Sequence, residues 1–270
     1  MRWTDALERL RTPAFAPFQA AIARLPGDRW PGHADLTAAA EGILTAHGKP
    51  VRFVPPRPPQ EGARPYYERQ VADTGEVQTR AQNWHDLFNA LAWIAYPKAK
   101  AAINAQHVAI LEERGEEEAK HRGPERDALT LFDESGVVVA SGAPELLRLI
   151  LEHEWKELFW RRRAELEAKV RFLMFGHSLA EKALEPRTGL GTKSVFVPVD
   201  ELFFMLPVEA QVARADARLA DHFARRTRFA SPKSMASVPA MGIPGWHPDN
   251  GDEGFYNDPA HFRSKPNAPV

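Results

Sequence analysis

The stretch that decides the fold is VRFLMFGHSLAEK, which runs from Val170 to Lys182. Its first six residues are mostly apolar, so residues 170–175 predict a buried strand. Gly176 then predicts a tight turn, because glycine tolerates the backbone angles of such turns, and residues 177–182 predict a short helix. A tight turn from a strand into a helix often presents a side chain at a functional site.

Further strands are predicted on both sides of this stretch. Residues 194–199 are apolar enough for one more strand. Upstream, residues 129–132 and 137–140 flank the turn-forming sequence DESG, which predicts a β-hairpin with a positive φ at Gly136. Residues 66–79 contain a similar turn signal and predict a second hairpin.

Helices account for most of the remaining chain. Asn83 is a suitable N-cap for a helix over residues 84–95, and Pro97 is suited to the first position of the next helix. Residues 144–169 and 208–223 predict two more amphipathic helices. We therefore expect an α+β fold in which helices pack around a small mixed or antiparallel sheet.

The whole chain, residues 1–270, is expected to form one domain. Residues 1–50 carry the N-terminal helices, and residues 55–65 form a proline-rich connector that favours neither helix nor central strand. The core follows over residues 66–230. Residues 231–270 contain seven prolines, which exclude regular helix. This tail also holds four aromatic residues, Trp246, Phe255, Tyr256 and Phe262. Disordered tails are poor in aromatic residues, so we expect an irregular tail that wraps the domain and buries its rings.

The composition excludes several classes of function. The chain has 35 basic and 36 acidic residues, and its net charge of −1 offers no electrostatic footprint for nucleic acid or for an anionic membrane. It has no cysteine, which excludes disulfides, thiolate nucleophiles and cysteine-ligated metals. No segment is apolar enough to span a bilayer or to act as a signal peptide. We expect a cytoplasmic protein that binds a small molecule, and neither nucleic acid nor membrane.

The first candidate site lies in the helix that begins after Asn83. His85 and Asn89 are four residues apart, so they project together from a face beside the apolar stripe. His85 is a candidate ligand or general base that Asn89 would orient. Asp86 completes a His-Asp dipeptide of the kind that occurs in metal-dependent phosphohydrolases. The alternative is that His85 only satisfies a buried carbonyl near the start of the helix.

A second histidine, His107, lies on the apolar face of the helix that begins at Pro97. It is a reserve metal ligand, and Asn104, one turn earlier, is its candidate partner. The alternative is an ordinary core histidine whose ring is satisfied by its neighbours.

Two acidic residues belong to the predicted hairpin region. Asp127 and Asp133 lie six residues apart, so they point to the same side of a regular strand. Two carboxylates on one side are suitable ligands for Mg²⁺ or Mn²⁺. For Asp133, as for Glu134, the alternative is a turn residue that hydrogen-bonds to its own backbone.

The turn at Gly176 leads to the last candidate pair. His177 and Glu181 are four residues apart and share a helical face. This spacing suits two metal ligands, or a carboxylate that holds an imidazole in one tautomer. The alternative is a surface pair that contributes little to stability.

Four runs of this sequence resemble the bacterial family called domain of unknown function 3025. They are NWHDLFNAL at residues 83–91, RDALTLFDESG at 126–136, FGH at 175–177 with EK at 181–182, and GIPGW at 242–246. The resemblance covers about residues 50–265 and implies no established activity. It does imply that six polar residues lie within the family's motif blocks, namely His85, Asp86, Asp127, Asp133, His177 and Glu181. Motifs rich in polar residues suit a shared pocket better than a core.

These observations predict a metal-dependent hydrolase, with a phosphoester as the expected substrate. The expected catalytic residues are His85, Asp86, Asn89 and His177. The expected ligands of a divalent Mg²⁺, Mn²⁺ or Zn²⁺ ion are Asp127, Asp133, His177, Glu181 and His107, and the ion would activate water. The alternative is non-enzymatic: the same residues form a structural hydrogen-bond network in a protein that binds a ligand or partner. An enzyme requires these side chains to open onto a concave pocket, with His85 and His177 close together.

Overall fold

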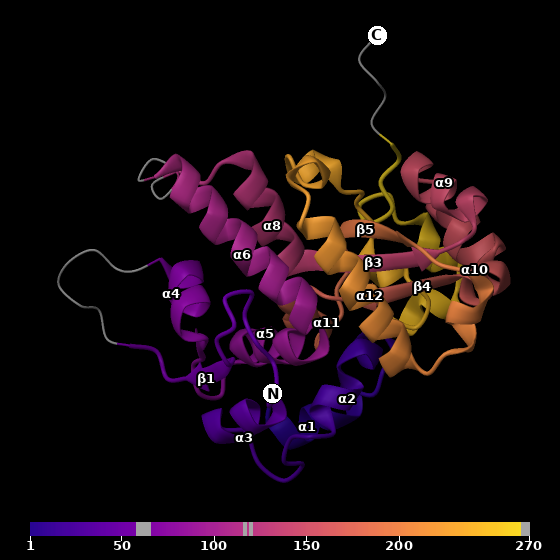
Figure 1. Ribbon diagram of the computed structural model, residues 1–270. Helices are drawn as coiled ribbons and strands as arrows, with labels where there is room; N and C mark the ends of the chain where they lie inside the picture. The colour runs from indigo at the N-terminus through magenta and orange to yellow at the C-terminus, as the bar shows by residue number, and fades with distance from the viewer. Residues whose placement is uncertain (58–65, 116–117, 119–120, 266–270) are drawn as a thin grey trace.

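The structure is a computed structural model that describes residues 1–57, 66–115, 118 and 121–265. The predicted proline-rich connector, residues 55–65, therefore lies outside the described residues from position 58 onward. Helices dominate the fold, and two small sheets lie among them (Figure 1). The α+β class predicted from the sequence is confirmed.

A mixed sheet of three strands forms the centre of the fold, in the order β4-β3-β5. β3 (Gly136–Ser141) pairs antiparallel with β4 (Val170–Met174) and parallel with β5 (Lys193–Pro198). Every residue of β3 is buried, as expected for a central strand covered on both faces. The strands predicted over residues 170–175 and 194–199 are thus confirmed to within one residue at each end.

The long helices pack against this sheet and against one another. α6 (Pro97–Arg114) contacts α12 (Val208–Phe223), and α5 (Trp84–Ala95) contacts α11 (His177–Ala183). α8 (Pro124–Ser135) leads directly into β3. Short 3-10 turns stand before and after α12, at Glu201–Met205 and Arg226–Arg228. In Figure 1, α12 crosses in front of the sheet, while α5, α6, α8 and α11 gather at one end of it.

The N-terminal part forms α1 (Trp3–Arg9), a 3-10 helix (Pro13–Phe18), α2 (Gln19–Ile22) and α3 (His33–Ala39). A small parallel sheet follows, in which β1 (Arg52–Val54) pairs with β2 (Glu76–Gln78). Aromatic stacking ties this part to α5, since the rings of Phe15 and Phe88 lie 5.7 Å apart. One continuous cluster of buried apolar residues therefore extends from α1 to the C-terminal segment.

The hairpin predicted over residues 66–79 is wrong. The chain forms α4 (Tyr67–Thr74) there, and β2 pairs with β1 instead of folding back on a neighbouring strand. Gly75, with φ of 74°, ends the helix in the left-handed conformation. Because α4 packs on α6 and buries Val71, the glycine marks the end of a helix, where the sequence suggested a hairpin turn.

The hairpin predicted over residues 129–140 is wrong in its first half. Residues 124–135 form α8, and Gly136 begins β3 with an ordinary φ of −68°. Pro124 occupies the first helical position, and the buried Leu129 and Phe132 recur at helical spacing. Asp133 and Glu134 therefore lie in the last turn of a helix, whereas Asp127 lies in its first turn.

The single helix predicted over residues 144–169 is interrupted. This region forms α9 (Pro144–Glu152), a π-helical turn (Glu157–Arg161) and α10 (Arg163–Lys169). His153, with φ of 59°, ends α9 in the left-handed conformation. The chain turns here because Trp155 is buried against the C-terminal segment, where its indole nitrogen donates a hydrogen bond of 2.8 Å to the carbonyl of Arg263.

Residues 231–265 form the predicted irregular tail, which packs beside β5. The backbone nitrogen of Ser194 donates to the carbonyl of Ala236 at 2.8 Å, and that of Thr192 donates to Val238 at 3.1 Å. Short 3-10 turns occur at Pro232–Ser234, Ala240–Gly242, Pro248–Gly251 and Glu253–Asn257. Trp246, Tyr256 and Phe262 are buried, and Phe255 is half-buried. The packed tail is therefore confirmed.

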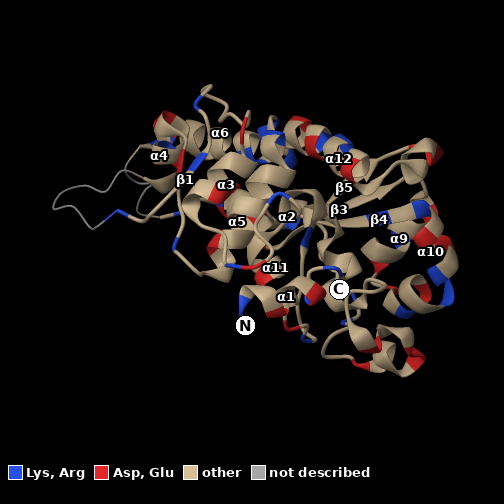
Figure 2. Ribbon diagram, turned by 90° about the horizontal axis from the view of Figure 1, so that it is seen from below, with Lys and Arg blue, Asp and Glu red and all other residues tan. Residues whose placement is uncertain are grey.

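Charged residues of both signs follow one another along α10 and α12, as Figure 2 shows. This interspersed pattern agrees with the near-zero net charge of the chain. Within the described part of the chain, no helix combines the length and the apolar character that crossing a membrane requires.

Candidate metal centre

Two glycines bring the ends of α8 and α11 into contact. Phe175 and Gly176 both donate their backbone N–H to the carbonyl of Gly136, at 3.0 and 2.9 Å. A Cβ atom on Gly176 would lie 2.4 Å from the nitrogen of Gly136 and 2.6 Å from the carbonyl oxygen of Glu134. Only glycine permits this approach, so the turn predicted from the sequence places His177 beside the last turn of α8.

Asn83 starts α5 as the sequence predicted, because its side-chain oxygen accepts a hydrogen bond of 3.0 Å from the backbone nitrogen of Asp86. Asp86 in turn accepts two side-chain hydrogen bonds from Arg80, at 2.9 and 2.8 Å. Burial would raise the pKa of Asp86, but these bonds outweigh burial and leave the pKa below its usual value. Asp86 is therefore a carboxylate paired with Arg80. His85 and Asn89, which flank it on α5, both line a pocket.

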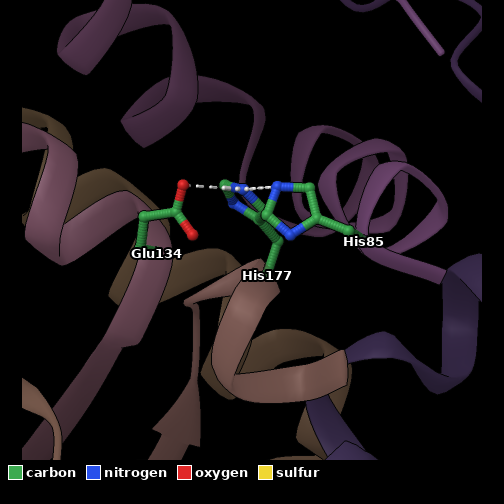
Figure 3. Close-up of side chains that lie close together, drawn as sticks. All are labelled: His85, Glu134 and His177. Carbon is green, nitrogen blue, oxygen red and sulfur yellow. Dashed lines mark hydrogen bonds and ion pairs between the residues drawn. The ribbon is translucent and has the colours of Figure 1, made fainter. Parts of the chain in front are cut away.

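Two histidines from different helices meet at this pocket. The Nε2 atoms of His85 and His177 lie 3.2 Å apart, and the ring planes are inclined at 76°. Glu134, in the last turn of α8, places its Oε1 atom 3.6 Å from His177 Nε2. The three ligand atoms lie within 4.8 Å of one another and come from α5, α8 and α11 (Figure 3). We call His85, Glu134 and His177 the candidate metal centre.

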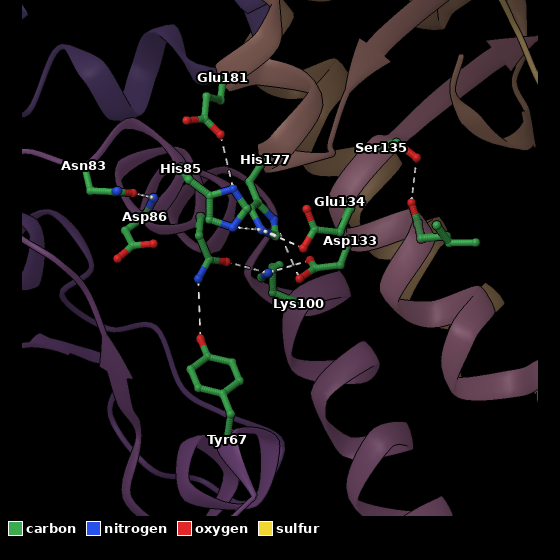
Figure 4. Close-up of polar contacts among 12 residues, drawn as sticks. Tyr67, Asn83, His85, Asp86, Lys100, Asp133, Glu134, Ser135, His177 and Glu181 are labelled. Carbon is green, nitrogen blue, oxygen red and sulfur yellow. Dashed lines mark hydrogen bonds and ion pairs between the residues drawn. The ribbon is translucent and has the colours of Figure 1, made fainter. Parts of the chain in front are cut away.

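The second nitrogen of each ring faces a carboxylate (Figure 4). His85 Nδ1 lies 3.3 Å from Glu181 Oε2, and His177 Nδ1 lies 3.7 Å from Asp133 Oδ2. Glu181 favours the His85 tautomer that has its proton on Nδ1 and a lone pair on Nε2. His177 Nδ1 is buried and has no hydrogen-bond partner in the described part of the chain. Glu181 therefore serves His85 on the neighbouring helix, although its spacing suggested His177 as its partner.

His177 is neutral at ordinary pH. Burial lowers its pKa to about 4, and the attraction of Asp133 does not compensate, since Lys100 and His85 lower the pKa further. The side chain of His177 is only 5% exposed. The neutral imidazole is the form that binds a metal ion.

A buried lysine holds Asp133 in place. Lys100 Nζ lies 2.5 Å from Asp133 Oδ1 and 2.8 Å from Asn89 Oδ1, and the ring of Trp93 lies 5.6 Å from the ammonium group. Burial would raise the pKa of Asp133, but the charge of Lys100 and its hydrogen bond outweigh burial and leave the pKa below its usual value. Asp133 is thus a carboxylate. A lysine ammonium has three donors, and these two bonds use two of them.

The pocket beside these residues has a volume of about 290 Å³. α4, α5, α6, α8 and α11 contribute its walls. Its polar lining includes Tyr67, Arg80, His85, Asn89, Lys100, Asn104, His107, Asp133, Glu134 and His177. A concave site lined by groups with perturbed pKa values is the usual setting of an active site.

Asp127 takes a different place from the predicted one. It lies on α8, where six residues of helix turn its side chain roughly 120° away from that of Asp133. The expectation that the two carboxylates point to the same side is therefore wrong, because the segment is helical where an extended strand was predicted. Asp127 does not line the pocket.

His107 and Asn89 line the pocket but have other partners than expected. His107 Nδ1 accepts a hydrogen bond of 3.3 Å from Arg126 Nε, and His107 is not among the grouped ligand atoms. Asn89 accepts from Lys100 and donates to the Tyr67 hydroxyl at 3.4 Å, so it does not orient His85.

Sequence reasoning missed two residues of this site. Glu134 was assigned to a hairpin turn, although Pro124 at a helix start and the helical spacing of Leu129 and Phe132 were signals for a helix. Lys100 was missed as well. It lies in the first turn of α6, where a lysine is ordinarily exposed, so no local signal indicated that it is buried.

Comparison with known proteins places the chain in a family. The model of the family described as "protein of unknown function (DUF3025)" matches residues 51–266. The chain belongs to the DUF3025 family. The matched region includes the whole candidate metal centre and begins after α3. No curated protein and no solved structure shows significant similarity to the chain.

Proposed function

We propose that this protein binds one divalent metal ion at His85, Glu134 and His177 and uses it to hydrolyse a small ester. The convergence of three ligand atoms from three helices on the wall of a pocket carries this proposal (Figure 3). Two imidazoles and one carboxylate, with a further position left open, are a ligand set of catalytic zinc sites.

The spacing of the ligand atoms fits a single ion. Bonds of about 2.0–2.1 Å at tetrahedral angles place neighbouring ligand atoms about 3.3 Å apart. The two Nε2 atoms lie 3.2 Å apart, and Glu134 Oε1 lies 3.6 Å from His177 Nε2. The Glu134 side chain is 37% exposed, so it has room for the small shift that completes the set.

The charges around the two rings also favour a cation. Glu181 and Asp133 lie beside the two Nδ1 atoms and favour the tautomers that carry the proton there, in which the two Nε2 lone pairs would face each other. A metal ion between them would relieve this repulsion. A carboxylate behind a metal-binding histidine is the usual arrangement around such ions, because it fixes the tautomer and the orientation of the ring.

A metal held by three protein ligands keeps a position for water or substrate and lowers the pKa of bound water. Imidazole ligands favour Zn²⁺ over Mg²⁺ among the ions predicted from the sequence. The third donor of Lys100 is suited to stabilise negative charge that develops on a substrate oxygen.

With its metal ion, the pocket would favour an anionic substrate. Its wall holds three basic side chains and four acidic ones, namely Arg80, Lys100 and Arg122 with Glu68, Asp86, Asp133 and Glu134. A divalent ion would therefore supply the excess positive charge that attracts an anion. A phosphoester of a small molecule matches this charge, and the volume of about 290 Å³ corresponds to the smaller ligand pockets. The proposal places the reaction in the cytoplasm, in keeping with a chain that has no cysteine.

Hydrolysis by metal-loaded protein tests the proposal. The protein is stripped of metal with a chelator, reloaded with Zn²⁺ or Mn²⁺, and assayed with p-nitrophenyl phosphate and bis(p-nitrophenyl) phosphate. We expect metal-dependent turnover that falls at least about 100-fold in His85→Ala and Glu134→Gln, since each removes a ligand. Glu209→Gln, at an exposed position of α12, is the matched control and should keep full turnover.

Turnover without metal, or turnover unchanged in the two ligand variants, would refute a metal-dependent hydrolase. A folded protein that binds no metal and hydrolyses no ester would instead favour the non-enzymatic alternative, in which the same residues form a structural hydrogen-bond network.

A further inference from the structure

The pocket extends along α6 beyond the candidate metal centre. Lys100, Asn104 and His107 line it, and their spacing places them on one face of the helix. A rise of 1.5 Å per residue puts His107 roughly 10 Å beyond Lys100. Within the described residues, neither Asn104 nor His107 hydrogen-bonds to the three proposed ligands. This end of the pocket is therefore available for a part of the substrate that is remote from the reacting bond.

Asn104 contributes an unsatisfied acceptor. The residue is 6% exposed, and its Nδ2 atom donates a hydrogen bond of 2.8 Å to the carbonyl of Glu68. This bond settles which end of the amide is the oxygen. Oδ1 is buried, and no hydrogen-bond partner for it exists in the described part of the chain. Buried acceptors without a partner are rare, because they have lost their hydrogen bonds to water. A ligand that donates to Oδ1 would remove this free-energy cost.

His107 contributes a donor three residues further along α6. Arg126 Nε donates to His107 Nδ1, so the ring carries its proton on Nε2. Arg126 is itself fixed, being 1% exposed and bonded to the carbonyl of Glu118 at 2.8 Å. Burial and the charge of Arg126 lower the pKa of His107 to about 3, which keeps the ring neutral. Nothing in the described ranges accepts a hydrogen bond from Nε2.

We propose that Asn104 and His107 form a subsite for a neutral amide or imide group of the substrate. The N–H of that group donates to Asn104 Oδ1, and its C=O accepts from His107 Nε2. An uncharged acceptor and an uncharged donor, three residues apart on the same face of α6, complement the –CO–NH– edge and do not suit a simple anion or cation. Val71 and Ile103, which also line the pocket, supply apolar contact for the rest of such a group.

This inference rests on the proposed function, because it assumes that the same pocket holds the substrate. Together, the two proposals describe an anionic ester that carries an amide or imide roughly 6–10 Å from the ester group, which is the rise along α6 from Lys100 to Asn104 and to His107. The subsite would select the substrate, and the metal centre would act on it.

Binding of two small imides tests the subsite without requiring activity. 1-Methyluracil presents an N–H between two carbonyls, and 1,3-dimethyluracil carries a methyl group in place of that hydrogen. Each is titrated into the full-length protein, and binding is followed by ligand-observed NMR. We expect 1-methyluracil to bind and the dimethyl compound to bind at least about tenfold more weakly, since it leaves the buried acceptor of Asn104 unpaired.

Three variants test whether the imide binds at Asn104. Asn104→Leu removes the acceptor and should weaken the binding of 1-methyluracil at least about tenfold. Asn257→Leu, at an exposed position, is the matched control and should bind as the wild type does. His85→Ala lacks a metal ligand but keeps the subsite, so it should retain binding. If Asn104→Leu does not fold, the comparison of the two imides with wild-type protein still tests the subsite.

The subsite is overturned if 1-methyluracil does not bind, if both imides bind equally, or if folded Asn104→Leu binds undiminished. Loss of binding in His85→Ala would place the imide at the metal centre and would also overturn it. A protein that binds the imide but no metal would refute only the proposed function.

Discussion

Each histidine of the candidate metal centre has a carboxylate beside Nδ1 and the other histidine beside Nε2. These neighbours determine which nitrogen is suited to bind a metal ion. His85 directs Nδ1 to Glu181, and His177 directs Nδ1 to Asp133, while the two Nε2 atoms face each other. Rings held in this way are oriented before any ligand arrives, which lowers the cost of binding one. The carboxylates are therefore as much a part of the site as the histidines.

Buried histidines also make the stability of the metal-free protein sensitive to acid. Burial lowers the pKa of His107 to about 3, whereas the unfolded value is 6.5. Below pH 6.5 the unfolded chain binds a proton that the folded protein does not, so the free energy of unfolding decreases as the pH falls. His177 acts in the same direction down to its pKa of about 4. The limiting slope is about 1.4 kcal/mol per pH unit for each histidine.

His107→Gln should remove one of these contributions. We expect its free energy of unfolding, measured with urea between pH 7 and pH 5, to decrease less steeply than that of the wild type. His47→Gln, at an exposed position, should follow the wild-type slope. Burial raises the pKa of Asp216 to about 6, which opposes the trend, but this effect is common to all three proteins and cancels. Identical slopes for His107→Gln and the wild type would show that His107 is not buried as a neutral ring.

At the scale of elements, one contact decides whether the site forms. The junction between α8 and β3 touches the junction between β4 and α11, and it does so through Gly136 and Gly176. This contact brings Glu134 and His177 together, although they lie 43 residues apart in the chain.

Gly176→Ala tests this contact. Its Cβ would meet backbone atoms of Gly136 and Glu134 at 2.4 and 2.6 Å, and backbone cannot rotate away. We expect the free energy of unfolding to fall by roughly 1–3 kcal/mol, and zinc affinity to fall at least about tenfold as His177 moves from Glu134. Gly27→Ala, where nothing lies within 4 Å of the new Cβ, should change neither quantity. Wild-type zinc affinity in Gly176→Ala would mean that the close contact is not needed for the site.

Sequence patterns predicted the elements whose signals are local. The strands around residues 170–175 and 194–199, the helix over 208–223 and the turn at Gly176 needed no knowledge of distant contacts. The two predicted hairpins failed because a glycine after polar residues marks the end of a helix as readily as a hairpin turn. Only the packing of α4 and α8 against α6 decides between them.

At the scale of the whole molecule, the C-terminal segment closes the fold (yellow in Figure 1). Asn250 is 2% exposed, and its Nδ2 atom donates to the carbonyls of Met241 and Ile243 at 3.0 and 2.6 Å. The hydroxyl of Tyr256 donates to the carbonyl of Asn250 at 2.9 Å. The hydrogen bonds of one buried residue, Asn250, thus connect the short 3-10 helices of this segment.

Asn250→Ala should therefore destabilise the whole protein. It leaves the carbonyls of Met241 and Ile243 buried without this partner, which costs about 1–3 kcal/mol of unfolding free energy. Asn257→Ala, which loses only an exposed hydrogen bond from Lys156, should change stability little. Urea unfolding measures both. Equal stability of the two variants, or rapid proteolysis of the folded wild type near residue 235, would argue against a tail that stabilises the fold.

The site as a whole was predictable only in part, because it is assembled from helices far apart in the chain. His85 and His177 stood out as histidines on amphipathic helices, and their meeting follows the prediction. Glu134 and Lys100 join them through contacts between α5, α6, α8 and α11 that no local pattern encodes. Asp127 was misplaced because its side-chain direction depends on whether the segment is helix or strand.

Isothermal titration of Zn²⁺ into metal-free protein tests whether His85, Glu134 and His177 hold one divalent metal ion. We expect one ion per chain, with an affinity that falls at least about tenfold in His85→Ala and in Glu134→Gln and is unchanged in Glu209→Gln. The absence of stoichiometric binding, or equal affinity in all four proteins, would show that these three residues do not bind a metal ion.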